Sequence, residues 1–115
     1  MRNLLLAALV TCLPTATLAA DWYVVIGYFD HPPMEWDDEV LTKANDLDAA
    51  LKDCGLSAFW DFTAKFDDFD TDGRGSVFVI NTFDRLNKAA AENLLAATKP
   101  CVPDAYIKQA NYAGE

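Results

Sequence analysis

The first candidate for chemistry is an acidic loop ahead of an apolar strand. Asp68, Asp70 and Asp72 stand at alternate positions and are followed by Gly73. Alternate carboxylates before a glycine open a calcium loop, because they converge on the ion while the glycine allows a sharp turn. The twelfth position of such a loop needs a bidentate Glu, but here it is Val79. The three acids are therefore weak metal candidates, and a solvated turn that keeps a sheet edge soluble accounts for them as well.

A second candidate is the acidic segment around His31, the only histidine, which excludes catalysis or metal binding that needs two imidazoles. The acids near it are Asp30, Glu35, Asp37 and Asp38. Their spacing matches no metal-ligand pattern, and a loop followed by a helix N-terminus accounts for them. The chain also has no nucleophile in a recognisable motif and no glycine-rich phosphate loop after its first strand. We therefore expect a protein that is not an enzyme and has no cofactor.

The composition limits the chain to one small globular domain. Its 115 residues are 52% hydrophobic and 12% aromatic, which is too hydrophobic for disorder and too short for two ordinary domains. The 18 acidic and 9 basic residues give a net charge of −9. Nucleic acids and anionic membrane surfaces are bound by clustered Lys and Arg, so neither is expected as a partner.

The first 20 residues have the three regions of a cleavable signal peptide. Arg2 supplies the positive charge, residues 4–13 form the apolar segment, and Ala20 ends a run of small residues. The apolar segment is too short to span a membrane, and no later stretch is long enough. An alternative is a lipoprotein signal, in which Cys12 carries a lipid and becomes the first residue. In either case we expect an exported protein, periplasmic or secreted.

The remaining chain alternates between strand and helix patterns. Strands are expected where aromatic and β-branched residues run together, and helices where apolar residues recur three and four positions apart. The patterns predict strands at 22–29, 56–66, 77–83 and 105–110, helices at 37–54 and 85–98, and a turn at 67–75. The domain is therefore expected to span residues 21–110, with a frayed tail at 111–115.

This order of elements predicts an α+β fold. Two amphipathic helices bury their apolar sides most economically against one face of a four-stranded antiparallel sheet, which is the ferredoxin-like βαββαβ arrangement. The other face of such a sheet has no helices to cover it.

Two cysteines, Cys54 and Cys101, follow the signal peptide. An even number of cysteines in an oxidising compartment favours a disulfide. In the expected fold, however, the helices run antiparallel, so the two cysteines fall at opposite ends of the helical layer. A helix over 85–98 is about 21 Å long, whereas a disulfide needs Cα atoms roughly 4.4 to 6.8 Å apart. Either a helix is short or bent and the bond forms, or the thiols are buried separately.

Aromatic residues are more numerous than one helix-covered sheet face must hold, and by strand alternation some point to the open face. They are Trp22, Tyr23, Tyr28, Phe29, Trp36, Phe59, Trp60, Phe62, Phe66, Phe69, Phe78 and Phe83. An exposed apolar patch usually marks an interaction site. The open sheet face is therefore the expected binding surface, unless loops or a second copy cover it.

The segments WYVVIGYF, VFVINTFDR and PDAYIK, with a helix after each of the first two, resemble the SPOR (sporulation-related) domain family. The resemblance covers nearly the whole mature chain and is closest to short, stand-alone exported members. Such domains are typically periplasmic, and many bind peptidoglycan glycan strands stripped of stem peptides through the open sheet face. The resemblance implies a binding site formed by Tyr23, Val25, Gly27, Tyr28, Phe29, Phe78, Asn81 and Thr82.

The chain departs from the glycan-binding pattern of that family. Val25 and Tyr28 stand where binding members usually have glutamine and serine on either side of Gly27, and Val77 stands where they often have arginine. Polar groups for a sugar are therefore few. The expected function is a non-catalytic envelope module that binds peptidoglycan glycan. The alternative is a periplasmic protein-interaction or structural module, with an envelope protein as its partner; a calcium-dependent module comes third.

Overall fold

The computed structural model describes residues 21–35, 37–67, 69, 71–82 and 85–113. The expected signal peptide and two of the three calcium candidates, Asp68 and Asp70, lie outside the described residues. In the described part of the chain, no helix is long and apolar enough to cross a bilayer.

Five strands, two α-helices and one short 3-10 helix make up the described fold. In chain order they are β1 (Asp21–Phe29), α2 (Asp38–Lys52), β2 (Ala58–Phe62), the 3-10 helix η2 (Thr63–Lys65), β3 (Phe66–Asp67), β4 (Ser76–Ile80), α3 (Lys88–Thr98) and β5 (Tyr106–Tyr112). The α+β class is confirmed. The single strand expected at 56–66 is wrong, because η2 divides it into β2 and β3.

The sheet is antiparallel, with the strand order β2-β4-β1-β5-β3. The expected four-stranded sheet is therefore wrong by one strand. Phe66 and Asp67 pair with Tyr112 and Asn111 at the end of β5. This pairing also corrects the expectation of a frayed tail, since residues 111 and 112 belong to β5.

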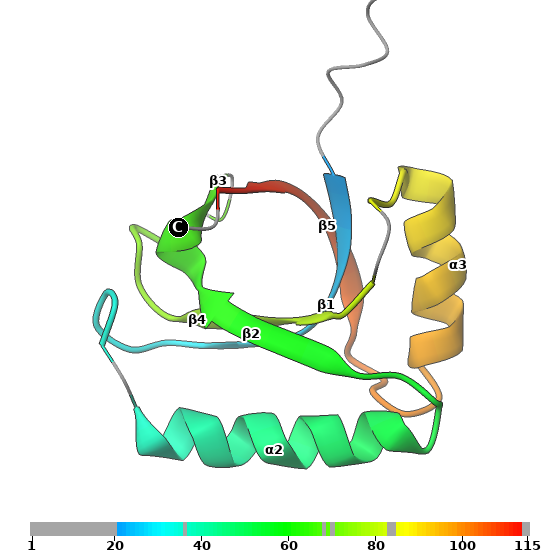
Figure 1. The fold of residues 1–115 in the computed structure, drawn as a ribbon, viewed down its shortest axis with the longest axis horizontal. Coiled ribbons are helices and arrows are strands. Elements are labelled where there is room, and N and C mark those ends of the chain that lie inside the picture. Colours follow the sequence, from blue (N-terminus) through cyan, green and yellow to red (C-terminus); the bar gives the residue numbers. More distant parts are fainter. Residues whose placement is uncertain (1–20, 36, 68, 70, 83–84, 114–115) are drawn as a thin grey trace, which may run out of the picture.

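The sheet is so strongly curled that its two edge strands approach each other (Figure 1). β2 and β3 form opposite edges, yet only the three residues of η2 separate them in the chain. Two hydrogen bonds join the end of β5 to this segment: the Tyr112 hydroxyl donates to the Asp61 carboxylate, and the Ala113 N–H donates to the Lys65 carbonyl. The face opposite the helices, here called the inner face, thus becomes the inside of a small, nearly closed ring of strands.

Both faces of the sheet hold a hydrophobic core. The helix-side core contains buried residues of α2 together with Val24, Ile26, Phe78 and Ile80 from β1 and β4, and Leu94 and Leu95 of α3 pack against it. The inner core consists of Val25, Phe66, Val77, Val79 and Ala110, none of which is more than 5% exposed. Both helices therefore lie on one face, but the other face is not open, because the chain itself fills it.

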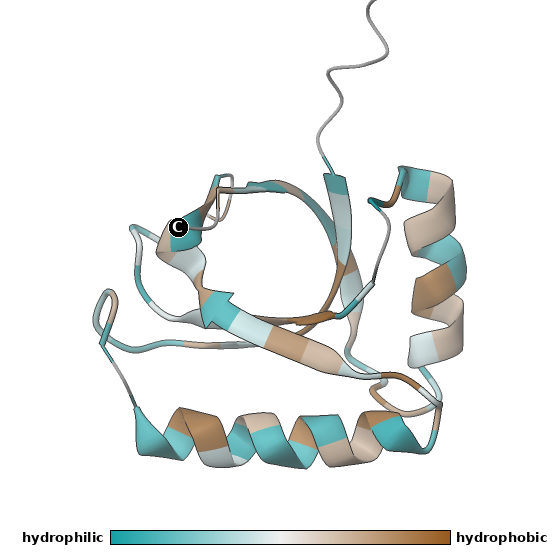
Figure 2. Cartoon of the chain, viewed as in Figure 1, coloured by the Kyte–Doolittle hydropathy of each residue, from teal (hydrophilic) through white to brown (hydrophobic). Residues whose placement is uncertain are grey.

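The two helices begin where side chains cap them. Asp37 accepts hydrogen bonds from the N–H groups of Glu39 and Val40 at the start of α2, and Asn87 accepts one from Ala90 at the start of α3. Such caps satisfy backbone donors that have no partner within the helix. Along α2, hydrophilic bands alternate with hydrophobic ones, as expected for a helix with one buried side (Figure 2). Helix α3 begins three residues later than the predicted 85.

The sequence does not decide whether a disulfide forms, and the structure shows that it does. Cys54 and Cys101 are bonded, with their Cα atoms 6.3 Å apart. The expectation that the cysteines lie at opposite ends of antiparallel helices is wrong. Figure 1 shows that the two helices run in different directions over the curled sheet and that their C-terminal ends meet at one corner. The curl of the sheet thus removes the conflict between fold and disulfide.

Candidate functional site

The structure distributes the predicted binding residues over both faces and both ends of the sheet. Val25 lies in the inner core at 0% exposure, whereas Phe78 lies in the helix-side core at 2%. Phe29 also packs on the helix side, with its ring 5.1 Å from that of Phe78. Tyr28 is exposed at the end of β1, where its hydroxyl donates to the Arg74 carbonyl. The eight residues therefore do not form one surface.

A β-bulge in β1 explains part of this distribution. Val25 pairs with Val79 and Gly27 pairs with Phe78, so Ile26 is an extra residue in β1. One extra residue reverses the alternation of side chains beyond it. Gly27 therefore lies on the helix side, where an added Cβ would be 3.1 Å from the Leu47 side chain.

Two predicted residues, Tyr23 and Thr82, line a pocket of about 190 Å³. The pocket lies where β1 and β2 begin and β4 and β5 end, which is one end of the curled sheet. Its aromatic and apolar walls come from Trp22, Tyr23, Phe59, Ile80, Leu86 and Tyr112, and its polar groups from Asp21, Thr82 and Arg85. Asn81, the neighbour of Thr82, is exposed and does not line this pocket.

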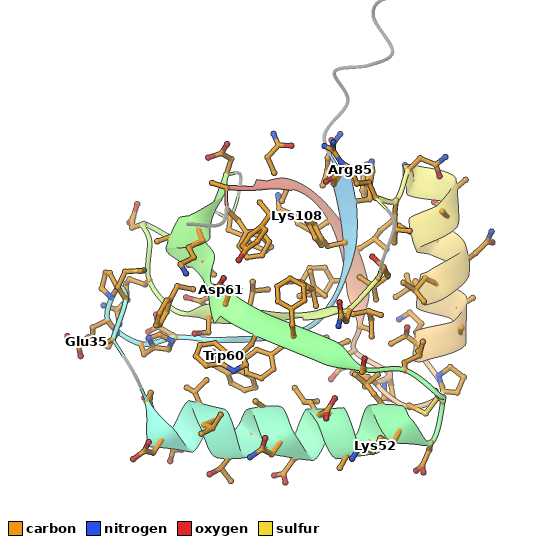
Figure 3. The ribbon with its side chains drawn as sticks, viewed as in Figure 1. Glu35, Lys52, Trp60, Asp61, Arg85 and Lys108 are labelled. Atoms are coloured by element: carbon orange, nitrogen blue, oxygen red, sulfur yellow. A yellow bond between two sulfur atoms is a disulfide. The ribbon has the colours of Figure 1, made fainter. Side chains whose placement is uncertain are left out.

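An ion pair stands at one side of the pocket. Arg85 Nε donates to Asp21 Oδ1 at 2.7 Å, and the Arg85 side chain is 78% exposed while that of Asp21 is 20% exposed. The Trp22 N–H donates to the Leu86 carbonyl at 3.1 Å, which holds this part of the chain against the start of β1. The hydrogen bond to Asp21 raises the pKa of Arg85, so its guanidinium stays charged. Figure 3 labels Arg85 beside the first strand.

Tyr23 presents its phenol to the pocket in the neutral form. Burial raises the pKa of Tyr23, and the Asp21 carboxylate raises it further, whereas Arg85 opposes the shift. A neutral hydroxyl both donates and accepts hydrogen bonds. The pocket therefore combines a phenol, a threonine hydroxyl, a carboxylate and a guanidinium with aromatic rings.

Tyr112 and Phe59 line the pocket beside the inner core. The Tyr112 ring lies 6.0 Å from that of Phe59 and 4.8 Å from that of Phe66, which belongs to the inner core. Figure 3 shows Asp61 on the inner side of β2 and Trp60 on the side of α2. Asp61 accepts the hydrogen bond from the Tyr112 hydroxyl. The pocket therefore lies next to the inner core.

Seven of the nine pocket residues are not among the site residues that the sequence predicts: Asp21, Trp22, Phe59, Ile80, Arg85, Leu86 and Tyr112. Trp22 and Phe59 belong to the surplus of aromatic residues, and that surplus was the useful signal. The sequence predicts a frayed tail at 111–115, so it does not indicate that Tyr112 lies near Asp21.

His31 and two of the acids near it, Asp30 and Asp37, have structural partners. His31 is 3% exposed; its Nδ1 lies 2.9 Å from the Pro32 carbonyl and its Nε2 2.6 Å from Ser76 Oγ. Asp30 binds Arg74 through both carboxylate oxygens, at 2.9 and 3.1 Å, and Asp37 caps α2. Ser76 is fully buried. Among the residues that the structure describes, no group of three or more His, Cys, Asp or Glu side chains could hold a metal ion.

No protein-family model matches the sequence, and neither a curated protein nor a solved structure matches it. The resemblance to SPOR domains therefore rests on the segments WYVVIGYF, VFVINTFDR and PDAYIK alone. The pocket at the end of the sheet is the structural feature that bears on function.

Proposed function

We propose that the protein is a non-catalytic, carbohydrate-binding module of the cell envelope, with peptidoglycan glycan as its ligand. The observation that carries the proposal is the pocket at the end of the curled sheet, where aromatic rings stand beside hydroxyl, carboxylate and guanidinium groups. Binding pockets typically combine apolar walls with a few polar groups that fix the orientation of the ligand.

The chemistry of the pocket suits a sugar ring. A pyranose has an apolar face of C–H groups, which packs against an aromatic ring, and a rim of hydroxyls that both donate and accept hydrogen bonds. Tyr23 and Thr82 offer hydroxyls, Arg85 offers donors and Asp21 offers acceptors. Val25 and Tyr28, where the family has polar residues, lie outside this pocket, so their apolar character does not count against sugar binding here.

The topology supports the relation to ferredoxin-like and SPOR domains. β4 lies between β1 and β2, which α2 connects, and β1 lies between β4 and β5, which α3 connects. This is the split βαβ arrangement of a ferredoxin-like fold. We infer that β3 is an addition to that fold, and that it moves ligand binding from the sheet face to the end of the sheet.

The disulfide supports the expected location outside the cytoplasm. Disulfides persist in oxidising compartments and are rare where thiols are kept reduced. The Cys54–Cys101 bond and the signal-like first 20 residues therefore agree with a periplasmic or secreted protein.

The second candidate function is a protein-interaction or structural module that does not bind glycan. One observation favours it: the inner face, which the family resemblance assigns to glycan, is occupied by the inner core. An envelope protein is then the partner.

Co-sedimentation with peptidoglycan sacculi tests the proposal. The purified mature protein is mixed with intact sacculi and with sacculi partly stripped of stem peptides by an amidase. Arg85→Ala is the pocket variant. Arg74→Ala is its matched control, because it removes a comparable exposed ion pair, Arg74 to Asp30, at the opposite end of β1.

We expect the wild type to pellet, and to pellet more after stripping. Arg85→Ala weakens binding about tenfold, the effect of losing one hydrogen bond that involves a charged group, and Arg74→Ala binds like the wild type. A folded wild-type protein that pellets with neither preparation would remove glycan binding and leave the interaction module. Equal losses in both variants would place the site elsewhere.

A further inference from the structure

The pocket is small and is backed by buried side chains, and this limits which part of a glycan it can hold. Phe59 and Tyr23 line the pocket and at the same time pack against the inner core. The core residues behind them, Phe66 and Ala110, are 5% and 0% exposed. In the described part of the chain, buried side chains therefore lie between the pocket and the inside of the ring of strands.

Between β5 and β2, the pocket is bounded by Tyr112 and Phe59. Tyr112 reaches from β5 to β2, where its hydroxyl donates to Asp61 and its ring packs near Phe59. At the mouth, Arg85 is largely exposed while its partner Asp21 is mostly covered. Arg85 therefore lies on a solvent-exposed side of the pocket.

The volume of the pocket agrees with one small group. It measures about 190 Å³, below the roughly 300 Å³ at which pockets for drug-sized ligands begin. An internal sugar of a glycan strand carries a neighbour on each side, so it needs a groove that is open at both ends. A terminal sugar has one neighbour, which can leave the pocket on the exposed Arg85 side.

We propose that this pocket takes the terminal pyranose ring of a glycan chain, and that the protein recognises chain ends. The inference rests on the proposed function and makes it more specific. The ring stacks on the aromatic walls, its hydroxyls bind Tyr23 and Thr82, and the second sugar lies outside beside Arg85.

The test counts binding sites on soluble glycan. Glycan strands freed of stem peptides are separated by length, and each fraction is titrated into the full mature protein by isothermal titration calorimetry. End recognition predicts one protein per chain at every length, and twice as many sites per gram after a muramidase has cut each chain once on average. Sites that increase in proportion to chain length would overturn end recognition while leaving glycan binding in place. No binding to any fraction would remove both.

A pair of variants ties the result to the pocket. Thr82→Trp places a large ring in the pocket, whereas Asn81→Trp places the same ring on the exposed neighbour that does not line it. We expect Thr82→Trp to lose binding by at least tenfold and Asn81→Trp to retain it, with both variants showing the wild-type circular dichroism spectrum. Retained binding in a folded Thr82→Trp protein would overturn the assignment to this pocket.

Discussion

The hydroxyl of Tyr112 donates a hydrogen bond to the carboxylate of Asp61, and this bond joins the last strand to the opposite edge of the sheet. The two residues are 51 positions apart in the sequence. Strands β2 and β5 are separated by β4 and β1 in the order of the sheet, so only the curl brings these side chains together. The bond therefore marks the closure of the ring that covers the inner core and forms one side of the pocket.

Removing this hydroxyl should loosen the closure. In Tyr112→Phe the ring keeps its contacts with Phe59 and Phe66 and only the hydrogen bond is lost. A hydrogen bond to a charged group contributes about 1.5 to 3 kcal/mol, and we expect less than this, about 1 kcal/mol, because Tyr112 is 40% exposed. For a domain of this size that lowers the melting temperature by about 5 °C.

Two comparisons isolate the bond. Tyr106→Phe changes another exposed tyrosine of β5 and should leave the melting temperature unchanged within about 1 °C. In an Asp61→Ala background, Tyr112→Phe should have almost no further effect, since the acceptor is already gone. A full effect of Tyr112→Phe in that background would show that the bond to Asp61 is not what stabilises the closure.

The parts of the fold that the sequence predicted depend on local signals. Helix α2 begins where Asp37 caps it and is followed by acids, and β1 is an uninterrupted run of aromatic and β-branched residues. The break between β2 and β3 has no such signal. There the Thr63 hydroxyl donates to the carbonyl of Arg74, 11 residues away, so a tertiary contact ends a strand whose apolar pattern continues.

The candidate site was less predictable for the same reason. Its members come from both ends of the described chain, Asp21 and Tyr112, and they meet only through the curl of the sheet. The bulge at Ile26 also moves Phe29 to the helix side. Because β1 has apolar residues on both faces, the sequence pattern does not reveal that the alternation of side chains reverses at the bulge. Strand alternation therefore indicated a surplus of aromatic residues but not the surface that they form.

Gly75 should be the least replaceable glycine of the turn before β4. Its φ is +87°, and a Cβ there would lie 2.5 Å from the Phe29 carbonyl oxygen. We expect Gly75→Ala to lower the free energy of unfolding by about 3 to 4 kcal/mol, the sum of left-handed strain and a backbone clash. Gly55→Ala is the control, because φ is +71° and no atom lies within 4 Å; it should cost about 1 to 2 kcal/mol. Urea unfolding measures both losses. If the two variants lose the same free energy of unfolding, the added Cβ does not clash with the backbone at Gly75.

The disulfide should supply a large share of the stability. It joins residues 47 positions apart, and closing a loop of that length stabilises the folded state by about 4 kcal/mol through the entropy of the unfolded chain. The double variant Cys54→Ala with Cys101→Ala should lose that amount in urea unfolding. Wild type in a reductant should approach the double variant, and the reductant should not affect the double variant itself. A double variant as stable as the oxidised wild type would mean that the bond contributes nothing.

The Asp30–Arg74 ion pair should make stability depend on acid pH. The hydrogen bond from Arg74 holds the pKa of Asp30 below its usual value near 4. A carboxyl whose pKa is lower in the folded state stabilises the fold fully above about pH 5, and this contribution disappears as the pH falls through the folded pKa. The melting temperature of the wild type should therefore exceed that of Asp30→Asn by a constant margin from pH 5 to 8. The margin should vanish towards pH 2, and 0.5 M salt should reduce it because both side chains are exposed. The Tyr28 hydroxyl also donates a hydrogen bond to Asp30 Oδ1, at 3.2 Å. A margin that persists unchanged at pH 2 would show that Asp30 acts through its shape or through this hydrogen bond rather than through its charge.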